Sequence, residues 1–130
     1  MKYTDKRAWI YTRIDAPEDA HGVLKKQEKE LYDYAEQMGM TVTGTSSDLG
    51  SGNSGLAAML KTARDGGFDI LIAMRSIVLG RNATEAMDVL RRLILMEIQM
   101  FSPKEGRILE DVDAPWGIQR MKKEIQEGRL

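Results

Sequence analysis

The sequence predicts an α/β fold in which a mostly parallel sheet of four to five strands carries helices on both faces. Short apolar runs typical of strands alternate with longer stretches in which apolar residues recur at helical spacing. The run over residues 68–73 is apolar almost throughout, which is typical of a central strand covered on both faces. Such alternation favours parallel strands joined by right-handed helical crossovers.

The first part of the chain supplies two of the expected strands and one long helix. Residues 8–14 combine β-branched and aromatic side chains and predict the first strand. The spacing predicts a helix over about residues 18–37, with Gly39 placed to end it. The second strand is expected over residues 40–45. Residues 46–55 are rich in Ser and Gly and are expected to form a mobile loop.

The central part supplies two further helices around the apolar strand, and then a fourth strand. A short helix is expected over Leu56–Ala63, ended by the glycine pair Gly66–Gly67. A third helix is expected to begin after Asn82, because asparagine favours the residue that caps a helix N-terminus. Residues 97–101 predict the fourth strand.

The C-terminal residues predict one short helix. It is expected to begin near Pro115, since proline is favoured in the first turn. Its apolar residues would form one face, which could support a dimer or pack on the chain's own domain: Trp116, Ile118, Met121 and Ile125. We therefore expect an α/β domain over residues 1–113, a C-terminal helix over residues 114–130, and no separate DNA-binding domain.

The composition is that of an ordinary folded domain. The chain has 130 residues, of which 42% are hydrophobic and 30% charged, values typical of one globular domain. It has no cysteine, which excludes disulfides and thiolate metal sites and agrees with a cytoplasmic location. The apolar runs are too short to span a membrane. The net charge of −1 predicts weak non-specific binding to nucleic acid.

Charged side chains follow three of the expected strands. Arg13 lies at the end of the first strand and Asp15 follows it, Asp48 follows the second, and Arg81 comes shortly after the apolar central strand. Because the carboxyl ends of parallel strands meet at one edge of a sheet, we expect these residues to share a rim. Two arginines there could converge on one anionic group, because the guanidinium fork matches phosphate or carboxylate oxygens.

The order and spacing of these motifs resemble the catalytic domain of the serine recombinases, the resolvase/invertase family. The resemblance covers roughly residues 8–102 and rests on six segments: Tyr11-Thr12-Arg13-Ile14, Leu24 with Gln27, Asp48-Leu49-Gly50-Ser51-Gly52, Gly55-Leu56 with Met59-Leu60, Phe68-Asp69-Ile70-Leu71-Ile72, and Leu79-Gly80-Arg81-Asn82. It implies a resolvase-like parallel α/β fold. It also implies a reaction in which a serine hydroxyl attacks a DNA phosphodiester while arginines stabilise the phosphate charge.

Compared residue by residue with the family, this chain keeps part of the site but lacks the nucleophilic serine. The family's serine falls at Asp15, a family arginine falls at Asn53, and a family Asp-Arg pair falls at Ile77-Val78. The matching residues are Arg13, Gln27, Asp48, Ser51 and Arg81. The resemblance therefore implies a degenerate recombinase domain that needs no cofactor or metal and binds DNA weakly at most. It would act as a structural or regulatory module, forming a homodimer or a heterodimer with an active recombinase.

An aspartate is a poor substitute for that serine. Two unit charges at ~4 Å and an effective dielectric of ~20 repel by about 4 kcal/mol, so a carboxylate opposes a DNA phosphate strongly. Asp15 also has structural interpretations. Asp15-Ala16-Pro17-Glu18 has the pattern of a helix capping box, and the Asp15 carboxylate could instead form a salt bridge with Arg13 or Arg81.

Two other classes of function remain open. Arg13, Arg81 and the Ser51–Gly55 amides, including that of Gly52, could form an anion- or nucleotide-binding module. Asp15 and Asp48 could instead hold Mg²⁺ in a phosphohydrolase, because hard cations prefer carboxylate oxygens. The single histidine, His21, leaves no histidine pair for a metal.

Overall fold

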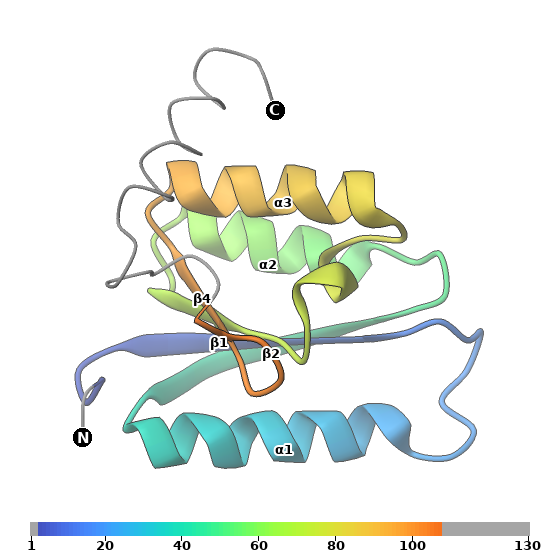
Figure 1. The fold of residues 1–130 in the computed structure, drawn as a ribbon, viewed down its shortest axis with the longest axis horizontal. Helices are drawn as coiled ribbons and strands as arrows, with labels where there is room; N and C mark the ends of the chain where they lie inside the picture. Colours follow the sequence, from blue (N-terminus) through green and yellow to red (C-terminus); the bar gives the residue numbers. More distant parts are fainter. Residues whose placement is uncertain (1–2, 108–130) are drawn as a thin grey trace.

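The computed structural model describes residues 3–107, which form one sheet with helices on both faces (Figure 1). Along the chain the elements are β1 (Arg7–Ile14), α1 (Val23–Met38), β2 (Thr41–Leu49), α2 (Ser54–Arg64), β3 (Ile70–Ile72), the 3₁₀ turn η1 (Ser76–Leu79), α3 (Ala83–Leu95), β4 (Gln99–Ser102) and β5 (Gly106–Arg107). The strand order is β2-β1-β3-β4-β5. The first four strands are parallel and β5 is antiparallel to β4, which confirms the expected α/β architecture.

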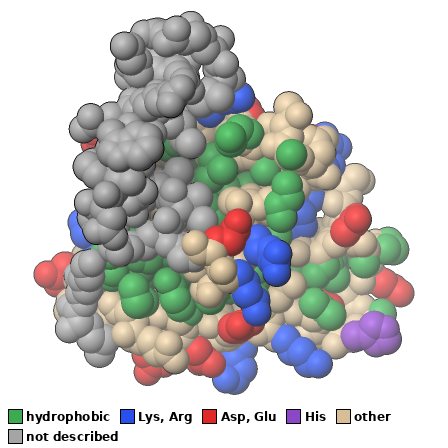
Figure 2. Space-filling view, viewed as in Figure 1, with side chains coloured by type: hydrophobic (Ala, Val, Ile, Leu, Met, Phe, Trp, Pro, Cys, Tyr) green, Lys and Arg blue, Asp and Glu red, His purple; other side chains and the backbone are tan. Residues whose placement is uncertain are grey.

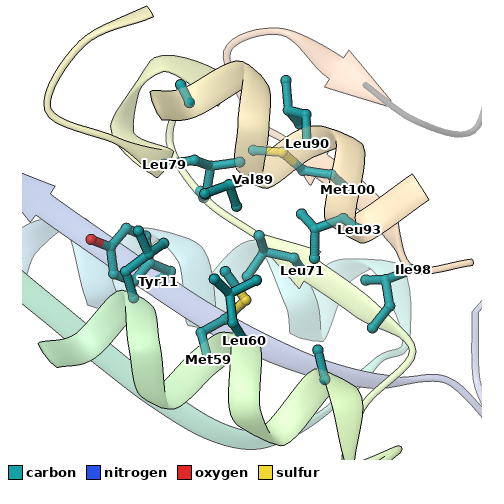
Figure 3. Packing of buried hydrophobic residues seen from close by; sticks show 14 of the residues in the cluster. Tyr11, Met59, Leu60, Leu71, Leu79, Val89, Leu90, Leu93, Ile98 and Met100 are labelled. Carbon is teal, nitrogen blue, oxygen red and sulfur yellow. The ribbon is translucent and has the colours of Figure 1, made fainter. Parts of the chain in front are cut away.

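The sheet separates two hydrophobic clusters. Helices α2 and α3 lie on one face, where side chains such as Tyr11 and Leu71 pack in the larger cluster (Figure 3). Helix α1 lies on the other face (Figure 1), where Ile10 and Ile72 pack in the smaller one. Strand β3 is buried throughout and contributes to both clusters, so the prediction of a central strand covered on both faces is confirmed.

Helix α1 begins later than the sequence predicted. Residues 15–22 form bends and turns, and the helix starts at Val23. The carboxylate of Asp19 accepts hydrogen bonds from the backbone N–H groups of Val23 at 2.7 Å and Leu24 at 3.2 Å. The prediction that Asp15 opens a capping box was therefore wrong, because Asp19 satisfies the free N–H groups of the first turn instead. Gly39 ends the helix in the left-handed conformation, as predicted.

Strand β2 runs to Leu49, so the expected loop over residues 46–55 was placed too early. Ser46 stays in the strand because its hydroxyl accepts a hydrogen bond from the Trp9 indole N–H at 3.0 Å and donates one to the Gly55 carbonyl at 2.7 Å. Asn82 caps α3 as predicted, since its side chain accepts a hydrogen bond from the Glu85 N–H.

Two predictions concern residues that the structure does not describe. The end of the proposed domain at residue 113 and the expected helix over residues 114–130 both lie outside residues 3–107. Within the described part, no helix is long and apolar enough to cross a membrane.

Candidate functional site

A cavity of about 290 Å³ lies at the carboxyl edge of the sheet. It brings together residues that follow three strands: Arg13, Asp15, Gly50, Ser51, Ile77, Val78, Gly80 and Arg81. The parallel register explains the convergence, because Arg13 on β1 is paired with Asp48 on β2 and both lie at the same end of the sheet. Four of the residues singled out in the sequence, Arg13, Asp15, Ser51 and Arg81, thus line one cavity.

The guanidinium of Arg13 is buried and already bonded inside the protein. Its Nε donates to the Tyr11 hydroxyl and to the Val78 carbonyl, both at 3.1 Å. Its Nη1 donates to the Gly50 carbonyl at 2.8 Å, and its Nη2 donates to the Asn53 side-chain oxygen at 2.5 Å. Every guanidinium nitrogen therefore has a protein acceptor, and the side chain is only 6% exposed.

Asp48 is the buried counter-charge of Arg13. Its Oδ2 lies 3.6 Å from Arg13 Nη2 and accepts hydrogen bonds from the Tyr11 hydroxyl at 2.6 Å and the Leu56 N–H at 2.8 Å. Its Oδ1 accepts from the Gly55 N–H at 2.8 Å. Asp48 thus places a negative charge at the N-terminus of α2, where the exposed N–H groups and the helix dipole favour it.

The Tyr11 hydroxyl links these two charged groups. Burial, and then the hydrogen bond to Asp48, raise the pKa of Tyr11 far above its usual value. The hydroxyl therefore stays protonated and donates to Asp48 while it accepts from Arg13. Figure 3 shows the Tyr11 ring at one end of the hydrophobic cluster, with its oxygen turned away from the labelled aliphatic side chains.

Arg81 also has an internal carboxylate partner. Its Nε and Nη2 donate to the Glu85 carboxylate at 2.9 Å and 2.8 Å, and its backbone N–H donates to the same group at 3.1 Å. The side-chain hydrogen bond from Arg81 is the main reason why the pKa of Glu85 falls to about 2. Both arginines of the cavity are therefore paired with acidic residues of the protein itself.

Asp15 lines the cavity without the structural partners that the sequence suggested. It does not cap α1. Among the ion pairs of the described residues, none joins Asp15 to Arg13 or Arg81, so the expected salt bridge does not form. Asp15 therefore lines the cavity beside two arginines that are paired with other acidic residues.

Two further predicted site residues, Gln27 and Gly52, do not line the cavity. Gln27 lies on α1, on the opposite face of the sheet from α2 and α3, and it is not among the residues that line the cavity. The N–H of Gly52 donates to the Leu49 carbonyl at 2.9 Å, and that of Gly55 donates to Asp48. Two of the five amides assigned to an anion are thus occupied, and of the other three residues only Ser51 lines the cavity with Arg81.

The geometry does not favour the magnesium alternative. Both oxygens of Asp48 accept hydrogen bonds from N–H or O–H groups, and Asp48 is not among the residues that line the cavity with Asp15. Among residues 3–107, no group of three or more His, Cys, Asp or Glu side chains is placed to hold a metal ion.

The sequence did not single out Glu85, and it named Tyr11 and Asn53 without identifying them as hydrogen-bond partners of Arg13. Strand alternation puts Tyr11 on the same face as Arg13, which was a usable signal. Arg81 and Glu85 are four residues apart, and Asn82 and Glu85 have capping-box spacing, so a pairing there could have been expected. The contact between Asn53 and Arg13 joins residues 40 positions apart and had no local signal.

Comparisons with known proteins agree with the geometry. The family model described as "Resolvase, N terminal domain" matches residues 8–127. A resolvase family site-specific recombinase from Streptococcus pneumoniae has a similar structure, with a TM-score of 0.72 and 18% identity over 96% of this chain and 99% of that chain. The N-terminal catalytic domain of TP901-1 integrase gives a TM-score of 0.69 at 19% identity, covering 96% and 100% of the two chains.

A third solved structure is the C-terminal catalytic domain of ISC1926 TnpA, an IS607-like serine recombinase. It gives a TM-score of 0.66 at 19% identity and covers 94% of this chain and 82% of that chain. No curated protein matches the sequence significantly. At these identities the solved structures show the shared fold, and the family match over most of the chain shows its membership. The chain belongs to the resolvase N-terminal domain family, whose fold is that of serine recombinase catalytic domains.

Proposed function

We propose that this domain is a serine-recombinase domain that has lost DNA cleavage and acts as a structural or regulatory dimerising module. The chemistry of the family requires a hydroxyl nucleophile and arginines that are free to bind phosphate. This chain has Asp15 at the position where the sequence resemblance places the nucleophile. The positions of two family arginines hold Asn53 and Val78, neither of which carries a charge.

The observation that carries the proposal is the internal bonding of Arg13. A phosphate-binding arginine offers N–H groups to phosphate oxygens. Here acceptors on Tyr11, Gly50, Asn53 and Val78 already engage all three nitrogens of the Arg13 guanidinium. Two of these acceptors belong to the residues that replace family arginines. The substitutions therefore remove two positive charges, and the Asn53 side chain also accepts a hydrogen bond from the arginine that remains. The Val78 acceptor is a backbone carbonyl, which any residue at this position would supply.

The charges around the cavity also oppose a phosphate. Arg13 and Arg81 supply two positive charges, while Asp15, Asp48 and Glu85 supply three negative charges. Where Figure 2 shows described residues, acidic and basic side chains are mixed with hydrophobic ones. DNA affinity depends mainly on cationic contacts to phosphates, so binding to this domain alone is weak.

The proposed dimer uses the C-terminal residues. Residues 114–130 contain the apolar residues Trp116, Ile118, Met121 and Ile125, of which the last three are spaced by three and four residues, as on one face of a helix. The partner is a second copy of the chain or an active recombinase. Sedimentation velocity tests the homodimer: the wild type is expected to sediment as a concentration-dependent dimer and Ile118→Glu as a monomer. Gln119→Glu, which adds the same charge off the apolar face, is the matched control and retains the dimer.

The loss of cleavage is tested by trapping a covalent intermediate. The purified protein is incubated with supercoiled plasmid DNA, the reaction is stopped with denaturant, and protein linked to DNA is measured beside an active serine recombinase. The expected result is no covalent adduct and no nicked plasmid. An adduct that requires residues of this domain would overturn the proposal.

A further inference from the structure

Glu85 engages the guanidinium of Arg81, the more exposed of the two arginines that line the cavity. It is the third residue of α3, and its two oxygens receive the Nε and Nη2 groups of Arg81 at 2.9 Å and 2.8 Å. This is the two-pronged geometry in which a guanidinium also binds a phosphate. The Glu85 carboxylate therefore stands where two phosphate oxygens would otherwise be received.

Glu85 also lies close to the other arginine of the site. It lines a groove together with Asn53, whose side chain accepts a hydrogen bond from Arg13. The positive charge of Arg13 contributes to the low pKa of Glu85. One carboxylate is thus near both guanidinium groups, although it forms hydrogen bonds only with Arg81.

We propose that Glu85 is a positioning residue that sets the anion affinity of the cavity by competing with phosphate for Arg81. This inference deepens the proposed function and rests on it, because a DNA phosphate is taken as the anion that Arg81 can meet. Arg13 is held by neutral acceptors and by buried Asp48, and it stays in place. Arg81 is half exposed and paired with a single side chain, so it is the arginine that can change partners.

A purely structural role for Glu85 makes a different prediction. Glu85 follows Asn82 by three residues, as in a capping box, but its carboxylate accepts a hydrogen bond from the backbone N–H of Arg81, one residue before the cap. Glutamine serves equally well at this position of a capping box. Glu85→Gln therefore keeps the acceptor for the backbone N–H and removes only the charge that competes with phosphate.

The test measures binding of a short fluorescein-labelled DNA duplex by anisotropy, at low salt. Glu85→Gln is expected to bind the duplex about fivefold more tightly than the wild type. This is the gain in affinity expected when the phosphate no longer has to displace one partly exposed ion pair. Glu30→Gln, which removes the same charge from an exposed site on α1, is the matched control and is expected to change binding far less. In an Arg81→Ala background, Glu85→Gln is expected to have no effect.

A second measurement locates the effect. Inorganic phosphate is titrated while the amide NMR signals of Ser51 and Gly80 are followed, and these signals are expected to saturate at lower phosphate concentration in Glu85→Gln. Equal DNA affinities for Glu85→Gln and Glu30→Gln, or a gain that persists without Arg81, would overturn the inference. A covalent DNA adduct of the wild type would instead refute the proposed loss of cleavage, so the two failures are distinguishable.

Discussion

The hydroxyl of Tyr11 donates a 2.6 Å hydrogen bond to the carboxylate of Asp48, which ties the middle of β1 to the end of β2. The same hydroxyl accepts a hydrogen bond from Arg13, and the same carboxylate receives two N–H groups of α2. A phosphate-site arginine, a strand and a helix N-terminus are thus held by one buried polar network. In such a network each member stabilises the position of the others.

Tyr11→Phe tests the hydroxyl in this network. The variant keeps the buried ring and removes one acceptor of Arg13 and one donor to Asp48. The free energy of unfolding is expected to fall by about 1–2 kcal/mol, the usual cost of losing a buried hydrogen bond. Chemical denaturation measures it. Tyr32→Phe, at an exposed tyrosine of α1, is the control and should change stability by less than about 0.5 kcal/mol.

Asp48→Asn tests the buried charge. The substitution leaves the Arg13 guanidinium buried without its counter-charge and weakens the acceptor for the α2 N–H groups. Unfolding free energy is expected to drop by about 3 kcal/mol, as for other broken buried ion pairs. Asp33→Asn breaks the exposed pair with Lys29 and should cost less than about 1 kcal/mol. Similar losses in the two variants would contradict the buried network.

The Arg81–Glu85 pair predicts a pH dependence of stability. The pKa of Glu85 is lowered in the folded protein from 4.5 to about 2. A carboxyl group with a lowered folded pKa stabilises the protein above its unfolded pKa, and this contribution is lost as the pH falls toward the folded pKa. The difference in Tm between the wild type and Glu85→Gln is therefore expected to be constant above about pH 5 and to shrink between about pH 4.5 and 2. A difference that does not change with pH would contradict the pair.

The left-handed backbone conformation of Glu97 predicts a substitution that stabilises the protein. Glu97 follows α3 with φ 59°, the one non-glycine residue with positive φ among those described. Glu97→Gly should raise the unfolding free energy by up to about 1 kcal/mol, because side chains disfavour this conformation. Gly66→Ala, at φ 73° in open space, is the reverse experiment and should lower stability by about 1 kcal/mol. Thermal denaturation of both variants shows whether the signs are opposite.

The fold could be predicted because its elements have strong local patterns. The apolar run around Ile70–Ile72 needs cover on both faces, and Asn82 and Gly39 mark helix ends by residue type. The start of α1 could not be read in this way, since Asp15 and Asp19 both offer a cap within a few residues. Which one caps is decided by the path of the chain after β1, and that path depends on tertiary packing.

The site was predicted as a set of residues, but their partners were not. Strand order brought Arg13, Asp15, Ser51 and Arg81 to one rim. The sequence could not show that Asn53 reaches Arg13 or that Asp48 caps α2, because these contacts join segments far apart in the chain. Polar residues of β2 also read as a loop, since their hydrogen bonds to Trp9 and Gly55 exist only in the folded protein.

Restoring the nucleophile tests most directly the central claim that the whole site, and not one residue, has lost DNA cleavage. Asp15→Ser places a hydroxyl at the nucleophile position while Asn53, Val78 and the internally bonded Arg13 remain. The measurement is the yield of covalent protein–DNA adduct on supercoiled plasmid after denaturation, with an active serine recombinase as the positive control. We expect no adduct from Asp15→Ser. An adduct from this single variant would show that the retained arginines suffice for cleavage and would contradict the account.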